Sequence, residues 1–144
     1  QGEEKFGDPT YVEQLRKSNI HVHTNVGDEE LHQLFAHCTF TIFPSLQEGW
    51  GIPVQESLMY GKVCLVSSTI PSAVEIDNAA LIRLEPHDFF GWREALETWV
   101  TNKAMREAFQ EQAKQYRPPS WQDISLSVLK REHYKAPRVV GCSA

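Results

Sequence analysis

The feature that most constrains the fold is a short apolar run, Phe40 to Phe43, followed at once by a loop rich in glycine and proline. The run predicts a buried β-strand. In the segment after it, Gly49 and Gly51 free the backbone, and Pro53 has the fixed φ angle that suits the first turn of a helix. A strand, a loop and a helix in this order predict a ligand pocket at the carboxyl end of a strand in an α/β sheet.

Two glutamates, Glu48 and Glu56, flank this loop. The main-chain N–H groups from Gly51 to Val54 are expected to be unpaired at the helix start, where they favour an anion such as a phosphate. The carboxylate of Glu56, about one turn into the helix, is placed to accept hydrogen bonds from vicinal hydroxyls. Glu48, on the loop, can reach other hydroxyls or a developing positive charge. A phosphate together with diols indicates a nucleotide-sugar ligand.

Helix and strand patterns alternate along the rest of the chain. Strands are expected over 20–24, 39–43, 63–67 and 80–84, and helices over 11–18 and from an N-cap at Asp28 through Cys38. Beyond Pro86 the pattern becomes helical, with three apolar stripes: Trp92, Leu96 and Trp99; Met105, Phe109, Ala113 and Tyr116; and Trp121, Ile124 and Val128. These patterns predict the α/β class, with a parallel strand pair around the helix that carries Glu56.

Composition and charge exclude several functions. The net charge of −5 argues against a nucleic-acid binder, which should carry a basic surplus. No apolar run approaches the roughly 18 residues of a transmembrane helix, and no secretory signal is recognised at the start. Cys38 and Cys64 lie in apolar contexts and are interpreted as small buried hydrophobic residues, which fits the reducing cytoplasm.

The order Pro44-Ser45, Glu48-Gly49-Trp50-Gly51-Ile52-Pro53 and Glu56 resembles the donor-binding signature of the retaining glycosyltransferases with two Rossmann-like domains, the GT-B fold. The likeness covers roughly residues 20–134, and within it the stretch from Pro71 to Glu75 resembles the loop that follows the next strand, so a loop is expected there. It implies a Rossmann-like parallel sheet with flanking helices, as in the C-terminal half of such an enzyme, followed by a helical C-terminal segment. Two departures stand out. Trp50 replaces the usual Phe, and Ser72-Ala73-Val74 replaces a glycine-containing turn before Glu75.

The resemblance also implies roles for single residues. Glu48 is similar to the catalytic carboxylate that engages the donor sugar, and Glu56 to the glutamate that holds the ribose hydroxyls. The other expected donor-binding residues are Ser45, Gly49, Trp50, Gly51, Ile52 and Val54. The loop at Asn25 and Val26 is either a wall for the base or a simple turn. Glu75 either lines the cleft or caps the turn that follows.

No metal or other cofactor is expected, because GT-B enzymes usually need none and the sequence has no Asp-x-Asp pair. The alternation of His21 and His23 could mimic a ligand pair, but it is interpreted as the polar face of a strand.

Residues 1–134 are expected to form a partial nucleotide-sugar-binding domain and residues 135–144 a flexible tail. The family's acceptor domain and its phosphate-neutralising Arg/Lys pair have no counterpart in this sequence, so the chain is interpreted as a fragment or truncated form. The resemblance implies a nucleotide-sugar donor, a glycan or lipid-linked acceptor bound through the absent domain, and no turnover by the isolated chain. The expected location is the cytoplasm, with any membrane contact peripheral at the inner face. Two alternatives stay open: a phosphorylase-type enzyme of the same fold, and a non-catalytic remnant or interaction domain.

Overall fold

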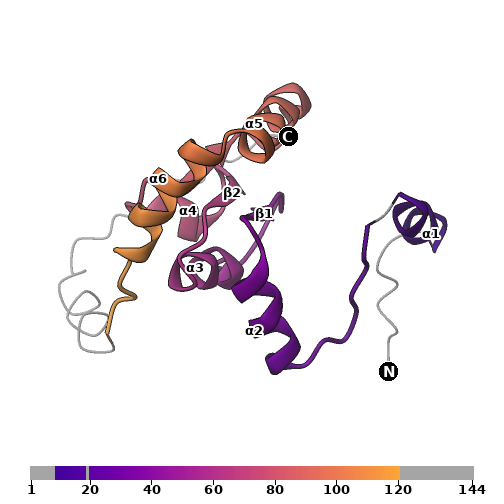
Figure 1. Cartoon of the computed structure of the whole chain (residues 1–144), viewed down its shortest axis with the longest axis horizontal. Helices are drawn as coiled ribbons and strands as arrows, with labels where there is room; N and C mark the ends of the chain where they lie inside the picture. Colours follow the sequence, from indigo (N-terminus) through magenta and orange to yellow (C-terminus); the bar gives the residue numbers. More distant parts are fainter. Residues whose placement is uncertain (1–8, 19, 121–144) are drawn as a thin grey trace, which may run out of the picture. The chain divides into compact units, whose positions relative to one another are not determined.

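The computed structural model describes residues 9–18 and 20–120, which fall into two units divided after Cys38 (Figure 1). The first unit contains helix α1 (Pro9–Lys17) and helix α2 (Asp28–His37), both of which the sequence predicts. The prediction of a strand over 20–24 is wrong, because this segment is irregular and the side chain of Ile20 is 47% exposed. A strand needs a neighbour for its main-chain hydrogen bonds, and none of the described residues supplies one here.

The start of α2 also differs from the prediction. Gly27 is the N-cap, and Asp28 is the first helical residue, with no side-chain hydrogen bond to the helix start. Three acidic residues nevertheless occupy the first turn, where negative charge is favoured by the helix dipole.

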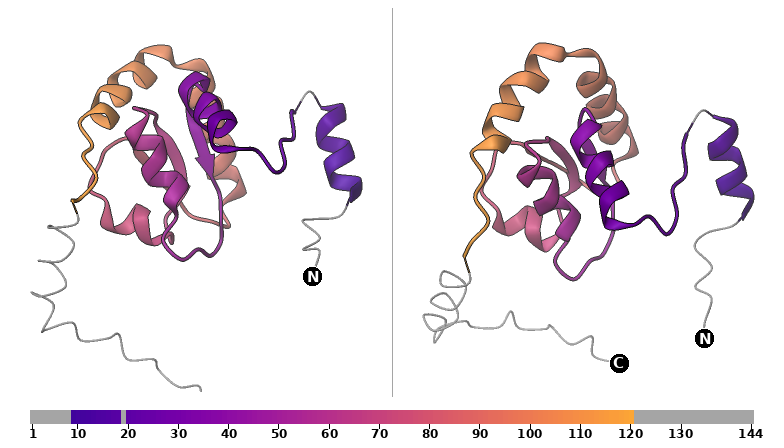
Figure 2. Two further views of the ribbon diagram at one scale, coloured as in Figure 1. Left: turned by 90° about the horizontal axis from the view of Figure 1, so that it is seen from below. Right: turned by 60° about the horizontal axis from the view of Figure 1, so that its bottom comes forward.

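The second unit is built on a parallel sheet. Among the described residues the sheet has three strands in the order β1 (Thr41–Phe43), β2 (Cys64–Ser67) and β3 (Leu81–Leu84). Leu65 pairs with Ile42 on one side and Ile82 on the other. Figure 2 shows the helices of this unit arranged around the strands. The predicted α/β class, with parallel strands joined through helices, is therefore confirmed.

Four helices belong to this unit within the described residues. Helix α3 (Ile52–Met59) joins β1 to β2 and contacts both of these strands, and helix α4 (Pro71–Glu75) joins β2 to β3. The expectation of a loop over Pro71 to Glu75 is therefore wrong. Pro71 stands at the start of α4, where its missing N–H costs no hydrogen bond. Helices α5 (Phe89–Thr101) and α6 (Lys103–Lys114) pack against each other, and α6 also packs against α3.

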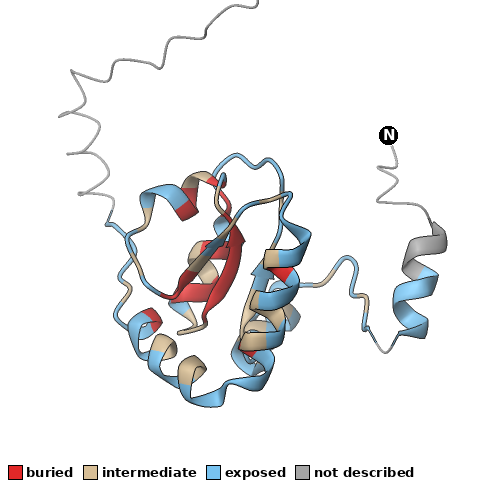
Figure 3. Cartoon of the chain, turned by 90° about the horizontal axis from the view of Figure 1, so that it is seen from above, coloured by how far each residue is buried: buried red, intermediate tan, exposed pale blue. Residues whose placement is uncertain are grey.

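The core centres on β2, every residue of which is buried (Figure 3). Trp99 of α5 meets Phe109 of α6 edge to face, with ring centroids 5.3 Å apart, so two of the predicted apolar stripes are confirmed as core. By contrast, β1 is only partly buried, and the Ile42 side chain is 46% exposed. The prediction of a buried strand over Phe40 to Phe43 is wrong, since β1 is an edge strand among the described residues.

The remaining expectations fall partly outside the described residues. Cys64 is buried and Cys38 half-buried, and neither forms a disulfide with another described residue. The third apolar stripe, from Trp121 to Val128, and the tail over 135–144 lie outside the residues that the structure describes. None of the described helices has both the length and the apolar character needed to cross a bilayer.

Candidate functional site

The candidate site lies at one edge of the parallel sheet. Because β1, β2 and β3 run in the same direction, their carboxyl ends meet at that edge. Residues 44–53, here called the signature loop, leave the end of β1 and include the first two residues of α3. The connection from β2 to α4 starts at the same edge, where the Ser68 N–H donates to the Leu84 carbonyl at 2.8 Å. Ligands of open α/β sheets bind at this edge.

The backbone of the signature loop depends on one of its two glycines. Gly51 is the N-cap of α3 and has a left-handed conformation, with φ 87° and ψ 54°. A Cβ atom there would lie 2.6 Å from Cγ2 of Ile70 and 2.8 Å from Oγ of Ser72, so only glycine fits. Gly49 has no positive φ, and a Cβ atom added to it would meet no other atom within 4 Å. The expected backbone freedom is thus confirmed at Gly51 and not used at Gly49.

Four consecutive main-chain N–H groups of the loop are unpaired. Within the part of the chain that the structure describes, no acceptor is found for the N–H groups of Gly49, Trp50, Gly51 and Ile52. The N–H of Val54, expected to be free as well, instead donates to the Gly51 carbonyl at 3.1 Å, so that expectation is wrong. This bond spans three residues, and bonds of this 3₁₀ type can satisfy an N–H group in the first turn of a helix. The site therefore offers free donors up to Ile52.

The two carboxylates have different surroundings. Glu48 is exposed, and its Oε1 lies 3.0 Å from the hydroxyl of Ser45, which also lies 3.1 Å from the Gln47 carbonyl. The hydroxyl has a single proton, so these two acceptors share it. Glu56 lies half-buried on α3, and its carboxylate has no partner among the described residues. Both carboxylates therefore keep free acceptor positions for a ligand.

A partly buried pair of hydroxyls ties α3 to β1. The Thr41 hydroxyl donates to the Ser57 hydroxyl at 2.7 Å, and the Ser57 hydroxyl donates to the Pro53 carbonyl, also at 2.7 Å. Ser57 is 1% exposed. Ser57 directly follows Glu56 in the chain. These bonds therefore restrict rotation of α3 about its axis and so help to fix the position of Glu56.

Trp50 gains an anchor that a phenylalanine would lack. Its indole Nε1–H donates to Oε1 of Gln55 on α3 at 3.2 Å. The ring remains 41% exposed. The departure from the family's usual Phe therefore adds a hydrogen bond between the loop and the helix that follows it.

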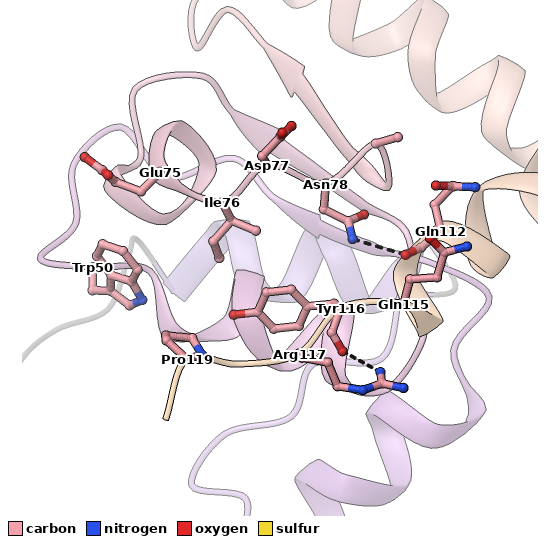
Figure 4. Close-up of a pocket in the computed structure, with 11 residues that line it drawn as sticks. Trp50, Glu75, Ile76, Asp77, Asn78, Gln112, Gln115, Tyr116, Arg117 and Pro119 are labelled. Atoms are coloured by element: carbon pink, nitrogen blue, oxygen red, sulfur yellow. Dashed lines mark hydrogen bonds between the residues drawn. The ribbon is translucent and has the colours of Figure 1, made fainter. Parts of the chain in front are cut away.

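Trp50 also lines a pocket of about 730 Å³ (Figure 4). Its lining comes from Trp50, the end of α4, the segment over 76–79 and the chain at the end of α6. Asn78 and Gln112 both line it, and the Asn78 side-chain amide donates to the Gln112 carbonyl at 3.1 Å. Glu75 lines this pocket, whereas Glu48 and Glu56 do not. The pocket is therefore a neighbour of the signature loop, with Trp50 as the shared wall.

Tyr116 lies within this pocket, with its hydroxyl toward the side where Trp50 and Pro119 lie (Figure 4). The hydroxyl oxygen is buried and has no hydrogen-bond partner of ordinary geometry among the described residues. Burial raises the pKa of Tyr116 above its usual value, and the Gln55 side chain opposes only part of the rise. The phenol is therefore neutral at physiological pH.

The remaining candidates lie in the first unit. Asn25 has a positive φ of 56°, which fits a turn, and Val26 is half-buried. Their role at the base stays a prediction. His23 contacts Glu30 across 2.9 Å, and both side chains are exposed. Among residues 9–18 and 20–120 no group of three or more His, Cys, Asp or Glu side chains is arranged to hold a metal ion.

Parallel strands, a glycine-dependent loop at their carboxyl edge and free N–H groups at a helix start define a Rossmann-like α/β domain with a ligand-binding loop. The family model described as "Glycosyl transferases group 1" matches residues 9–116, which is most of the chain. The chain therefore belongs to the glycosyl transferases group 1 family, and the resemblance noted in the sequence is confirmed.

Curated relatives are mannosyltransferases of Escherichia coli. The chain is 34% identical over 77 residues to "Serotype-specific mannosyltransferase WbdA", a match that covers 54% of this chain and 9% of the relative. It is 27% identical over 112 residues to "O-antigen chain mannosyltransferase B", covering 72% of this chain and 27% of the relative. The chain thus spans about a quarter or less of the length of these relatives.

Sequence reasoning missed three residues that support the loop: Gln55, Ser72 and Arg83. Gln55 accepts the hydrogen bond from the Trp50 indole. Ser72 contacts the carbonyls of the signature loop, and Arg83 holds the helix that carries Ser72. The one signal in the sequence was the departure at Ser72 from the family's glycine-containing turn.

Proposed function

We propose that this chain binds the nucleotide-sugar donor of a glycosyltransferase that transfers a hexosyl group, with retention of configuration, to a glycan or lipid-linked acceptor. The observation that carries the proposal is the run of unpaired N–H groups from Gly49 to Ile52, placed in the chain between Glu48 and Glu56. Free N–H groups at a helix start favour phosphate oxygens, and carboxylates accept from sugar hydroxyls.

Each group has a task in this proposal. The N–H groups of Gly49, Trp50 and Gly51 contact hydroxyls of the donor sugar, and the N–H of Ile52, at the first position of α3, faces a phosphate. Glu56 holds the ribose hydroxyls. Glu48, steadied by Ser45, lies next to the reacting carbon, where its charge stabilises an oxocarbenium-like transition state.

The family relatives guide the choice of donor. Because the named relatives are mannosyltransferases, a mannosyl donor is the first sugar to test. The acceptor is a glycan or a lipid-linked glycan, and no nucleic acid is involved. We also propose a cytoplasmic location, with any membrane contact peripheral at the inner face. Cys38 and Cys64 form no disulfide with the described residues, which is in keeping with a reducing compartment.

The first experiment measures ligand binding to the full chain by thermal shift and titration calorimetry, with UDP, GDP, ADP and their sugar conjugates. We expect one nucleotide to bind, and Glu56→Ala to weaken it roughly 10- to 100-fold, the worth of charge-assisted hydrogen bonds. Glu94→Ala is the matched control, because Glu94 is an exposed glutamate on α5. Equal loss in both variants, or no binding to the folded wild type, would count against a donor site in this chain.

A second variant separates the sugar from the nucleotide. Glu48→Gln keeps the size of the side chain and removes its charge. We expect it to leave the affinity for the free nucleotide unchanged and to remove the extra affinity that the sugar conjugate shows. A loss of affinity for the free nucleotide would place Glu48 at the base or phosphates instead of the sugar.

A further inference from the structure

The signature loop rests on the start of α4 through one buried residue. The Ser72 N–H donates to the Trp50 carbonyl at 3.0 Å, and the Ser72 hydroxyl donates to the Gly51 carbonyl at 3.1 Å. Ser72 is fully buried. A single side chain and its own main chain thus hold two successive carbonyls of the loop.

Holding these carbonyls also orients two N–H groups. The Trp50 carbonyl shares a peptide plane with the Gly51 N–H, and the Gly51 carbonyl shares one with the Ile52 N–H. All described peptide bonds are trans, so each N–H points away from its carbonyl. With both carbonyls turned toward α4, the N–H groups of Gly51 and Ile52 face the opposite way. Successive N–H groups arranged in this manner form an anion-binding concavity.

The support for Ser72 continues into the sheet. Arg83 of β3 donates through Nε to the Ala73 carbonyl and through Nη2 to the Ile76 carbonyl, both at 2.6 Å. The central strand β2 pairs with β3 at this point, where Val66 is opposite Arg83. The middle and the end of α4 are therefore fixed against the sheet.

The close approach of Ser72 is possible only because Gly51 has no side chain. A Cβ on Gly51 would lie 2.8 Å from the Ser72 hydroxyl oxygen. The two residues are thus complementary, although 21 positions separate them in the chain.

We propose that Ser72 is a positioning residue for donor binding, which aims the Gly51 and Ile52 N–H groups at the donor by holding the carbonyls behind them. This inference rests on the proposed function. Ser72 itself does not touch the donor. Its two bonds have separate effects, because the Ser72 N–H holds the Trp50 carbonyl and the hydroxyl holds the Gly51 carbonyl.

The substitution Ser72→Ala separates the two bonds. It removes the bond to the Gly51 carbonyl and keeps the main-chain bond to the Trp50 carbonyl. The Gly51 carbonyl retains the Val54 N–H, so the helix start is preserved. Ser67→Ala is the matched control, because Ser67 is equally buried and its hydroxyl has no partner among the described residues.

The first measurement uses NMR on the full chain without ligand. Loss of a hydrogen bond moves a carbonyl carbon upfield. In Ser72→Ala we expect the Gly51 carbonyl carbon to move upfield by more than that of Trp50, and neither to move in Ser67→Ala. An unmoved Gly51 carbonyl carbon would overturn the positioning role.

The second measurement compares the affinity of UDP, GDP and ADP with that of their nucleosides. In Ser72→Ala we expect the bound diphosphate to lose roughly three- to tenfold in affinity, the worth of one hydrogen bond, and the nucleoside to lose none. An equal loss for both would show a general structural role and overturn the proposal. If the wild type binds none of them, donor binding by this chain fails as a function, and the carbonyl shifts alone decide whether Ser72 orients the loop.

Discussion

The two halves of the signature loop are held in different ways. The first half, residues 44–49, is exposed at Glu48 and Gly49, and the side-chain hydrogen bonds of Ser45 stay within the loop itself. The second half, residues 50–53, is tied to α4 through Ser72 and to α3 through the Trp50 indole. The half that carries the proposed catalytic carboxylate thus has side-chain bonds only within the loop, whereas the half that presents the N–H groups of Trp50, Gly51 and Ile52 is held by α3 and α4.

This difference has a physical logic. Phosphate groups are much the same in every nucleotide-sugar, so rigid N–H groups can be aimed at them without a cost for reorganisation. The sugar must be accommodated with its own set of hydroxyls, and a carboxylate on an adjustable segment can follow them. The comparison predicts that substitutions in the second half are costly for stability and those in the first half are tolerated.

The largest difference in stability is expected between alanine substitutions at the two glycines of the loop. Gly51→Ala places a Cβ at a positive φ and 2.6 Å from Ile70, so we expect it to lower the free energy of unfolding by about 2 to 4 kcal/mol. Gly49→Ala meets open space and should change it by less than about 0.5 kcal/mol. Urea unfolding of both variants measures the difference. Similar midpoints for the two would break the comparison.

The sequence predicted the loop but not what holds it. The strand at β2, the helix at α3 and the need for glycine follow from local patterns, since apolar runs and glycine–proline spacing depend on neighbouring residues. The contact of Ser72 with Gly51 joins two βα units, and nothing in the local sequence of either unit specifies it. The only signal in the sequence was the departure at Ser72 from the family pattern. That departure marks the position as unusual, but it does not predict the contact with the Gly51 carbonyl.

The two errors in strand prediction have the same origin. The segment over 20–24 has a strand-like alternation and forms no strand, because no partner strand pairs with it among the described residues. The apolar run from Phe40 to Phe43 forms β1 only at Thr41–Phe43, and this strand is partly buried because it lies at the edge of the sheet. Alternation and apolar character indicate the capacity to pair, whereas pairing and burial depend on the neighbours that the fold supplies.

The second-largest difference in stability is expected between alanine substitutions at two buried serines. Ser57→Ala removes the donor to the Pro53 carbonyl and the acceptor for Thr41, which ties α3 to β1. We expect a loss of about 1 to 2 kcal/mol in the free energy of unfolding. Ser67→Ala removes an equally buried hydroxyl that has no partner among the described residues, and it should be neutral within about 0.5 kcal/mol. If urea unfolding shows equal losses, the hydroxyl pair does not anchor the fixed half.

A smaller effect is expected from pH at the pocket beside Trp50. Burial raises the pKa of Tyr116 in the folded chain above the unfolded value of 10.0. The unfolded chain therefore loses this proton first as pH rises, so the stabilisation is complete below pH 10 and declines as pH passes through the folded pKa. Tyr116→Phe should lack this part of the alkaline decline. The measurement is thermal unfolding of both proteins between pH 8 and roughly 11, and parallel declines would show that Tyr116 titrates as it does in the unfolded chain.

The smallest effect is expected in the first half of the loop and tests the comparison most directly. Ser45→Ala removes the hydroxyl that bonds Glu48 and the Gln47 carbonyl, both of which are exposed and can turn to water. We expect a change of less than about 0.5 kcal/mol in the free energy of unfolding by urea. A loss near that of Ser57→Ala would mean that the hydrogen bonds of the Ser45 hydroxyl stabilise the loop as much as the Thr41–Ser57 hydroxyl pair stabilises the attachment of α3. The carboxylate of Glu48 would then be as fixed as the N–H groups, and selection among sugars would depend on the geometry of a rigid site.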